Sequence, residues 1–154
     1  MSFVIRTANK KDIDTIVLFQ IYMARETEGL ELNEEIVKEG VKNAFNTPNH
    51  GQYFIAEDNG VVVGSLLITY EWSDWRNGTV WWIQSVYIRK ENRGQKVFKR
   101  MFEFLKEKVT KSSEIKGLRL YVDKRNTSAI KVYQAIGMDS KHYDMFEWFP
   151  FEIC

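Results

Sequence analysis

The chain is poor in cysteine and histidine: it has one cysteine, Cys154, and two histidines, His50 and His142, among 154 residues. A single cysteine excludes an internal disulfide framework and a zinc site built on cysteines. Neither histidine has metal-ligand companions in the sequence, so we expect no metal site. No apolar run approaches the roughly 18–20 residues of a membrane-spanning helix, and the N-terminus has no signal-peptide pattern. We therefore expect a cytoplasmic protein with no membrane partner.

An excess of charge of either sign is also lacking. Lysine and arginine number 22 and aspartate and glutamate 21, which gives a net charge of +1. Nucleic-acid-binding domains are usually basic as a whole, so we expect no nucleic-acid partner. Hydrophobic residues make up 44% of the chain and charged residues 28%, which is typical of a soluble globular domain. At this length we expect one domain, over residues 1–154.

Hydrophobic periodicity predicts a mixed α/β domain with the element order βααβββαβαβ. The expected strands cover residues 3–6, 53–56, 61–72, 79–88 and 118–122, with a last β region through Tyr143 and Phe149. Four helices are expected: one that begins after Asp12, one over residues 36–45, one that begins after residue 96, and one from Asn126 to Ala135. Asp12 and Asn126 are suitable helix N-caps, and Gly137 is a suitable helix end. The sequence shows no internal repeat, linker or low-complexity stretch.

A local basic cluster follows the strand that ends at Ile88. Its cations are Arg89, Lys90, Arg93, Lys96, Lys99 and Arg100, with Glu91 as the single acid. The start of a helix presents unpaired N–H groups and the positive end of a dipole, which together suit a phosphate group. The alternative is a solvated charged helix face, as most charge runs are.

Two segments resemble the GNAT superfamily of N-acetyltransferases, whose element order matches the one above. The segment Arg93–Phe98 is similar to the family's Arg/Gln-x-x-Gly-x-Gly/Ala motif at a helix start, with Lys96 and Phe98 in place of the later glycines. The segment Asn126–Met138 resembles the family's Asn-x-x-Ala-x-x-x-Tyr-x-x-x-Gly-Phe pattern and is the more specific match. A weaker resemblance, in residues 69–94, is to the diamine (spermidine/spermine-type) acetyltransferases.

The resemblance implies an α/β (α+β) domain with a mixed, mostly antiparallel sheet flanked by helices. It also implies acetyl-CoA as co-substrate, bound at the helix start through its pyrophosphate. The residues it assigns to the cofactor are Val86, Tyr87, Ile88, Arg93, Gly94, Gln95, Lys96, Val97, Phe98, Lys99 and Asn126. Lys96 keeps the backbone N–H that glycine would supply. Phe98 either obstructs the cofactor or turns into the core beside Phe102.

The resemblance also implies two catalytic positions. Tyr133 is where the family has the general acid that protonates the coenzyme A thiolate; its alternative is a core residue on the stripe of Ala129, Val132 and Ile136. Gln84 stands where the diamine branch often has a glutamate. Glutamine cannot take a proton near neutral pH, so a water chain, another acid (Glu71 or Asp74) or a different substrate is expected. The N–H groups near Val86 and Tyr87 are expected oxyanion donors if the strand has the family's bulge.

The acceptor is expected to be a small primary amine or polyamine. An acidic patch, Glu26, Glu28, Glu31, Glu34 and Glu35, lies between the first two expected helices, where the family binds its acceptor. Within it we select Glu28 and Glu31, with Trp75 as a cation–π wall; the alternatives are a solvated turn and a hairpin packing residue. Aromatic residues in the last β region favour a homodimer by edge pairing. The alternative to an enzyme is a non-catalytic acyl-CoA-binding or regulatory module, motivated by Gln84, Lys96 and Phe98.

Overall fold

The computed structural model describes residues 3–151, so Cys154 lies outside the described residues. The elements are β1 (Val4–Thr7), α1 (Ile13–Glu28), α2 (Glu34–Asn46), β2 (Gln52–Asp58), β3 (Val61–Ser73), β4 (Gly78–Ile88), α3 (Val97–Lys111), β5 (Ile115–Arg119) and α4 (Thr127–Ala135). Three short 3₁₀ turns, η1 (Lys10–Asp12), η2 (Pro48–His50) and η3 (Lys90–Asn92), lie between them. The chain forms two compact units, Met1–Arg119 and Leu120–Cys154, and each is described by itself.

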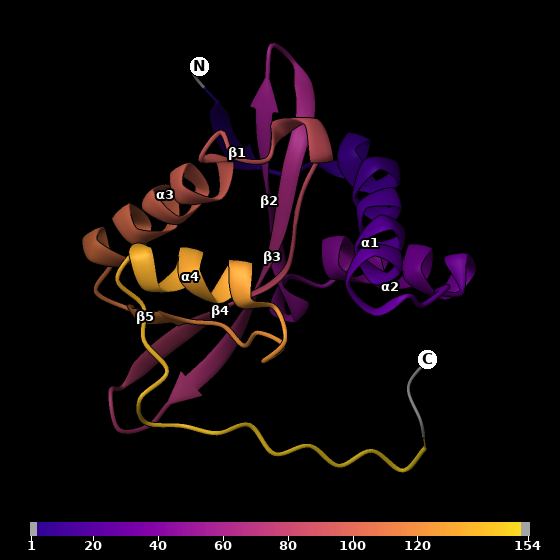
Figure 1. Cartoon of the computed structure of the whole chain (residues 1–154). Helices are drawn as coiled ribbons and strands as arrows, with labels where there is room; N and C mark the ends of the chain where they lie inside the picture. Colours follow the sequence, from indigo (N-terminus) through magenta and orange to yellow (C-terminus); the bar gives the residue numbers. More distant parts are fainter. Residues whose placement is uncertain (1–2, 152–154) are drawn as a thin grey trace. The chain divides into compact units, whose positions relative to one another are not determined.

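The first unit is built on a five-stranded sheet in the order β1-β2-β3-β4-β5 (Figure 1). Strands β1 to β4 pair antiparallel as a meander, and β5 pairs parallel to β4 after the α3 crossover. A parallel neighbour requires such a crossover, because a tight turn can join only antiparallel strands. The predicted α/β class with a mixed, mostly antiparallel sheet is confirmed.

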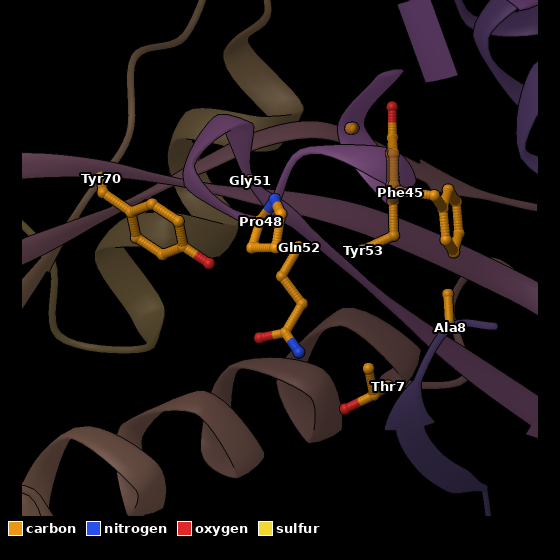
Figure 2. Close-up of a pocket in the computed structure, with 9 residues that line it drawn as sticks. Thr7, Ala8, Phe45, Pro48, Gly51, Gln52, Tyr53 and Tyr70 are labelled. Atoms are coloured by element: carbon orange, nitrogen blue, oxygen red, sulfur yellow. The ribbon is translucent and has the colours of Figure 1, made fainter. Parts of the chain in front are cut away.

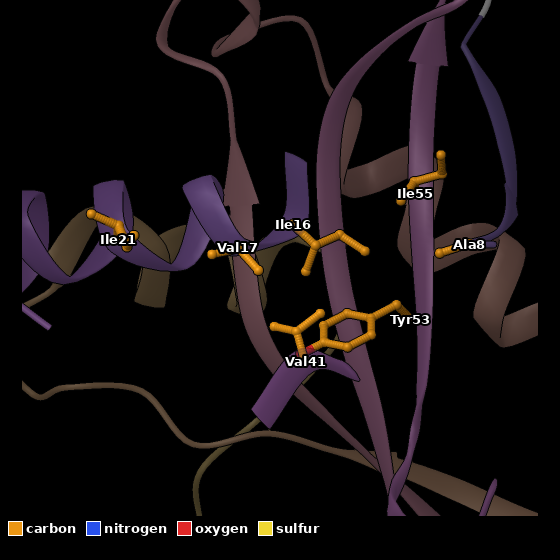
Figure 3. Packing of buried hydrophobic residues seen from close by; sticks show 7 residues of the cluster. All are labelled: Ala8, Ile16, Val17, Ile21, Val41, Tyr53 and Ile55. Carbon is orange, nitrogen blue, oxygen red and sulfur yellow. The ribbon is translucent and has the colours of Figure 1, made fainter. Parts of the chain in front are cut away.

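Helices α1 and α2 cover one face of this sheet and α3 covers the other. The rings of Tyr53 and Phe54 show this, because consecutive strand residues point to opposite faces. Tyr53 stacks on Phe45 of α2 at 5.7 Å, whereas Phe54 meets Phe104 of α3 edge-on at 5.8 Å. On the α1/α2 side, Ile16, Val17 and Ile21 pack with Val41, Tyr53 and Ile55 (Figure 3).

Strand β4 carries a bulge that reorients its second half. Gln84 pairs with Leu67 and Tyr87 with Ser65, so two residues of β4 oppose one of β3. Ser85 has a φ of 53°, in the left-handed region that L-residues rarely adopt. The extra residue places Gln84 and Tyr87 on the same face of the sheet. That face is the α1 side, because the Tyr87 ring lies 4.9 Å from the ring of Phe19.

Asp12 occupies the N-cap position of α1, but its carboxylate makes no capping hydrogen bond to α1. It instead accepts two hydrogen bonds from the Arg6 guanidinium, at 2.9 and 3.0 Å, and one from the Asn9 N–H at 2.7 Å. Arg6 also donates to Glu57 at 2.6 Å. The sequence-based role of Asp12 as the cap of α1 was therefore wrong. Arg6 competes successfully because it brings a positive charge to an almost buried carboxylate.

In the second unit, α4 begins and ends as predicted. The Asn126 side chain accepts a hydrogen bond from the Ala129 N–H at 3.2 Å. Gly137 has a φ of 96°, and the Met138 N–H closes the helix end on the Tyr133 carbonyl at 3.0 Å. The stripe expected on α4 is altered, since Val132 is 43% exposed while Ala129 and Tyr133 are half-buried.

Two predicted β regions differ from the structure. The strand expected at 118–122 is shifted to Ile115–Arg119, because the ladder with β4 ends at the Trp82–Arg119 pair. The last expected β region is irregular from residue 138 to residue 151. Alternating aromatic residues fit a strand, but a strand also needs a ladder partner, and this segment pairs with no described strand.

Candidate active site

The basic turn between β4 and α3 has a backbone shaped for an anion. Gly94 has a φ of 78° and Lys96 a φ of 63°, and α3 begins at the next residue, Val97. Turns that alternate between right- and left-handed conformations direct successive N–H groups toward one point. Lys96 thus adopts the left-handed conformation for which glycine is favoured.

The N–H groups of this turn are the feature that fits a pyrophosphate. The N–H groups of Gly94, Gln95, Lys96 and Val97 donate to no backbone acceptor within residues 3–151. The Lys96 carbonyl, at the N-cap of α3, accepts a hydrogen bond from the Arg100 N–H at 3.1 Å. The side-chain Oε1 of Gln95 is buried and has no partner in the described part of the chain. Unsatisfied donors at the positive end of a helix dipole bind phosphate groups.

Four of the six cations of the turn divide into two groups, and the other two, Lys90 and Arg93, pair with Glu26. Arg89 is structural, since its Nε donates to the Val62 carbonyl at 2.8 Å and its guanidinium lies 5.0 Å from the Phe19 ring. Lys96, Lys99 and Arg100 are exposed and form no ion pair with any described residue. This second group therefore remains available to a phosphorylated ligand.

Phe98 lies at the start of α3 and is half-buried. Its ring is 6.4 Å from that of Phe102, one helical turn further on. The ring thus lies beside Phe102 without being fully buried.

Gln84 lies on the α1 side of β4, and its Nε2 donates to the Thr69 hydroxyl oxygen at 2.6 Å. Glu71, considered above as an alternative base, is committed elsewhere on the same face. Its carboxylate accepts from the Trp82 indole N–H at 2.8 Å and from Arg119 at 2.7 Å. These contacts lower the pKa of the Glu71 carboxyl, with the Trp82 hydrogen bond as the main cause. A carboxylate with a lowered pKa is a poor base.

Tyr133 and Asn126 lie on α4, in the second unit. The Tyr133 side chain is half-buried, and its burial raises the pKa of the phenol above the ordinary value of 10.0. A raised pKa keeps the hydroxyl protonated at neutral pH, as a proton donor requires. The Asn126 side chain is engaged as the α4 cap, as described above.

The residues predicted to bind the acceptor differ in their partners and in their exposure. Glu31 accepts two hydrogen bonds from the Arg25 Nε, at 2.8 and 3.0 Å, which neutralises its charge. Glu28, the last residue of α1, is exposed and pairs with no described residue. Trp75 is 92% exposed at the β3–β4 turn, with no ring contact or hydrogen bond to the α1–α2 turn within residues 3–151. Of the other tryptophans, Trp81 is buried and Trp82 half-buried, so these two pack in the sheet.

One contact was not foreseen from the sequence. Glu26, placed above only within an acidic patch, accepts a hydrogen bond from the Arg93 Nη2 at 2.6 Å. The two residues are 67 positions apart, so no local pattern signals the pair. The contact brings the acidic end of α1 against the basic turn, and thus two of the sequence-predicted sites lie side by side.

A pocket of about 270 Å³ lies elsewhere in the first unit (Figure 2). Its lining comprises Thr7, Ala8, Ala44, Phe45, Pro48, Gly51, Gln52, Tyr53 and Tyr70. The lining has no charged side chain and no predicted site residue, so it does not suit a phosphate group.

None of the helices in the described chain is long and apolar enough to cross a membrane.

Comparisons with known proteins show a family match and similar solved structures. The model of the acetyltransferase (GNAT) family matches residues 15–138. A possible acetyltransferase from Clostridium difficile 630 is 39% identical, with a TM-score of 0.91 over 99% of this chain and 100% of that one. A predicted acetyltransferase from Clostridium acetobutylicum, solved with acetyl-CoA, is 21% identical, with a TM-score of 0.73 over 95% of this chain and 96% of that one.

The structure of AAC(6')-Iy in complex with the bisubstrate analogue CoA-S-monomethyl-acetylneamine shares the fold. It is 16% identical, with a TM-score of 0.76 over 98% of this chain and 100% of that one. No curated protein sequence matches the chain. The family match and the 39% identical relative show that the chain belongs to the acetyltransferase (GNAT) family. It is therefore an N-acetyltransferase, and acetyl-CoA is its co-substrate.

Proposed function

We propose that this N-acetyltransferase moves the acetyl group of acetyl-CoA to a small primary amine or polyamine. The amine attacks directly, and no covalent enzyme intermediate forms. The observation that carries the proposal is the Glu26–Arg93 contact, which joins an acidic helix end to a basic turn. An anionic cofactor and a cationic acceptor require such neighbouring sites. One domain over residues 1–154 is part of the proposal, since the family match at 15–138 crosses the boundary between the two units.

The turn from Arg93 to Lys99 is the proposed holder of the pyrophosphate. The N–H groups of Gly94, Gln95, Lys96 and Val97 supply hydrogen bonds, and the Lys96 and Lys99 side chains supply charge. Ile88 belongs to the site through its carbonyl, which accepts a hydrogen bond from the Arg93 Nε at 2.9 Å. Phe98 contributes its backbone, since its ring packs beside Phe102. When bound, acetyl-CoA supplies a thioester whose acetyl carbon accepts a nucleophile.

The bulge in β4 is the proposed centre of transfer. The interrupted ladder at Ser85 supports Val86 and Tyr87 as sources of N–H donors for the negative oxygen that forms during attack. Gln84 lies on the same face as Tyr87, and its side-chain oxygen is the proposed acceptor for the incoming amine or a bound water. Holding the two substrates in this geometry contributes much of the rate, up to about 7–11 kcal/mol at best.

Tyr133 is the proposed general acid. When the carbon–sulfur bond breaks, the thiolate takes the phenol proton, and the amine nitrogen loses its proton to solvent through water. The raised pKa of Tyr133 supports this role because the hydroxyl stays protonated near neutral pH. Asn126 is proposed to contact the cofactor while it caps α4.

The acidic α1–α2 turn is the proposed acceptor site. Glu28 is the stronger candidate, because no described cation neutralises it, whereas Glu31 contacts the acceptor only if Arg25 gives way. Trp75 is exposed and offers its ring to a cationic amine. The complex of the fold relative AAC(6')-Iy with CoA-S-monomethyl-acetylneamine supports an amine as the acceptor.

Thermal unfolding in the presence of acetyl-CoA, coenzyme A or ATP tests the cofactor site. A ligand that binds only the folded state stabilises it by about 2.7 kcal/mol at a hundredfold excess over Kd. We expect stabilisation by both coenzyme A species and none by ATP. Absence of a shift at millimolar coenzyme A would remove the basic turn from the proposal.

A further inference from the structure

Glu26 lies on the last turn of α1, and its side chain is 24% exposed. Its Oε2 accepts the short hydrogen bond from Arg93, while its Oε1 lies 3.6 Å from the Lys90 Nζ and 3.3 Å from the Tyr87 hydroxyl. Partial burial raises the pKa of the Glu26 carboxyl, but the bond and charge of Arg93 outweigh it and lower the pKa below the ordinary value. The carboxylate is therefore charged at neutral pH.

Arg93 is held from three sides. Its Nε donates to the Ile88 carbonyl, its Nη2 donates to Glu26, and its guanidinium lies 5.4 Å from the centre of the Tyr87 ring. The guanidinium of Arg93 is thus already engaged with a carboxylate. A phosphate can use Arg93 fully only if the ion pair with Glu26 is exchanged, since both anions need the same charge-assisted hydrogen bonds.

We propose that Glu26 competes with the cofactor pyrophosphate for Arg93 and Lys90, and that cofactor binding releases the Glu26 carboxylate to a cationic acceptor. The inference rests on the proposed function and deepens it. Before the cofactor binds, Glu26 pairs with Arg93 and Lys90. After binding, the phosphates hold the two cations and the ammonium of the acceptor pairs with Glu26. Cofactor and acceptor then favour each other, because binding of either one frees the partner that the other needs.

Isothermal titration of coenzyme A into the wild type, Glu26→Gln and Glu39→Gln tests the competition. Glu39 pairs with Lys42 on α2, so its substitution removes the same charge without touching Arg93. We expect Glu26→Gln to tighten coenzyme A binding about fivefold, the scale of a partly exposed ion pair, and Glu39→Gln to leave it unchanged. A gain in affinity is not a result that structural damage produces. Unchanged or weaker binding in Glu26→Gln overturns the inference.

Two further arms separate the competing explanations. In an Arg93→Gln background the gain from Glu26→Gln should shrink, whereas a full gain there would mean a general charge effect and overturn the role of Arg93. Spermidine at saturation should tighten coenzyme A binding in the wild type but not in Glu26→Gln; an equal effect in both overturns the release of Glu26 to the acceptor. Failure of the wild type to bind coenzyme A overturns the proposed function as well, and so differs from every other outcome.

Discussion

The side-chain amide of Gln84 donates a hydrogen bond to the hydroxyl oxygen of Thr69, at 2.6 Å across β3 and β4. With the nitrogen as the donor, the oxygen end of the amide points away from Thr69. The Gln84 oxygen is therefore the end left for a substrate amine or a water. A glutamine held in this way positions a nucleophile but does not remove its proton.

Gln84→Leu should lower kcat/KM for the amine about tenfold, the scale of one hydrogen bond to a charged group. The Kd for coenzyme A should stay unchanged, because the basic turn is untouched. Thr69→Val is the matched control: it keeps the amide but removes its partner, and a smaller loss is expected. Steady-state kinetics at fixed acetyl-CoA measure both. A Gln84→Leu enzyme with the wild-type kcat/KM would reduce Gln84 to a strand residue.

Tyr133→Phe should lower kcat about a hundredfold, the lower range of general acid catalysis, with a near-normal Kd for coenzyme A. The substitution removes the phenol proton and keeps the aromatic ring. Tyr70→Phe removes a hydroxyl from a tyrosine of the pocket in Figure 2 and should leave kcat unchanged. Full turnover in Tyr133→Phe would remove this residue from the mechanism.

Lys96 adopts a left-handed conformation that costs a non-glycine residue about 1–2 kcal/mol. Lys96→Gly removes this strain, but glycine also gives the unfolded chain more entropy, which offsets part of the gain. The net effect should be a rise of about 0.5 kcal/mol in the free energy of unfolding. Lys96→Ala keeps the strain and should not. Both variants lose the same cation, so both should weaken coenzyme A binding about threefold. Urea unfolding and titration calorimetry check the two effects, and equal stability of the variants would contradict the backbone argument.

The contribution of Asp12 to the free energy of unfolding should be larger above pH 4 than below it. Its burial raises the pKa of the carboxyl, but the hydrogen bonds from Arg6 and Asn9 outweigh that and lower the pKa below 3.8. A lowered folded-state pKa gives stability above the unfolded value that is lost as the pH falls through the folded one. Asp12→Asn should cost about 1–3 kcal/mol at pH 7 and flatten the acid loss. A parallel acid limb in urea unfolding of wild type and variant would contradict this.

Periodicity and turn chemistry predicted the order of elements through α4, because most of those elements carry an apolar stripe and lie next to a turn or a cap residue. Gly137 and Asn126 are examples, since both limit α4 as expected. The shift of β5 and the irregular segment 138–151 were not predicted, since a strand depends on its partner as well as on its own residues. The homodimer expected from that segment stays a prediction.

The sequence predicted those parts of the site that depend on a short local pattern of residues. The N–H groups at Gly94 and Lys96 follow from a glycine turn before a helix. The bulge at Ser85 was implied by the family resemblance alone, because serine does not signal a positive φ. The Glu26–Arg93 pair depends on how α1 meets the basic turn, and only the folded chain brings its two residues together.

Acetyl transfer to an amine is tested by measuring coenzyme A release from acetyl-CoA, through detection of the free thiol, with a panel of small primary amines and polyamines. We expect thiol release that depends on the amine, with polyamines among the substrates and little release without an amine. Amine-independent release, or none with any amine although coenzyme A binds, would contradict acetyl transfer to a small amine.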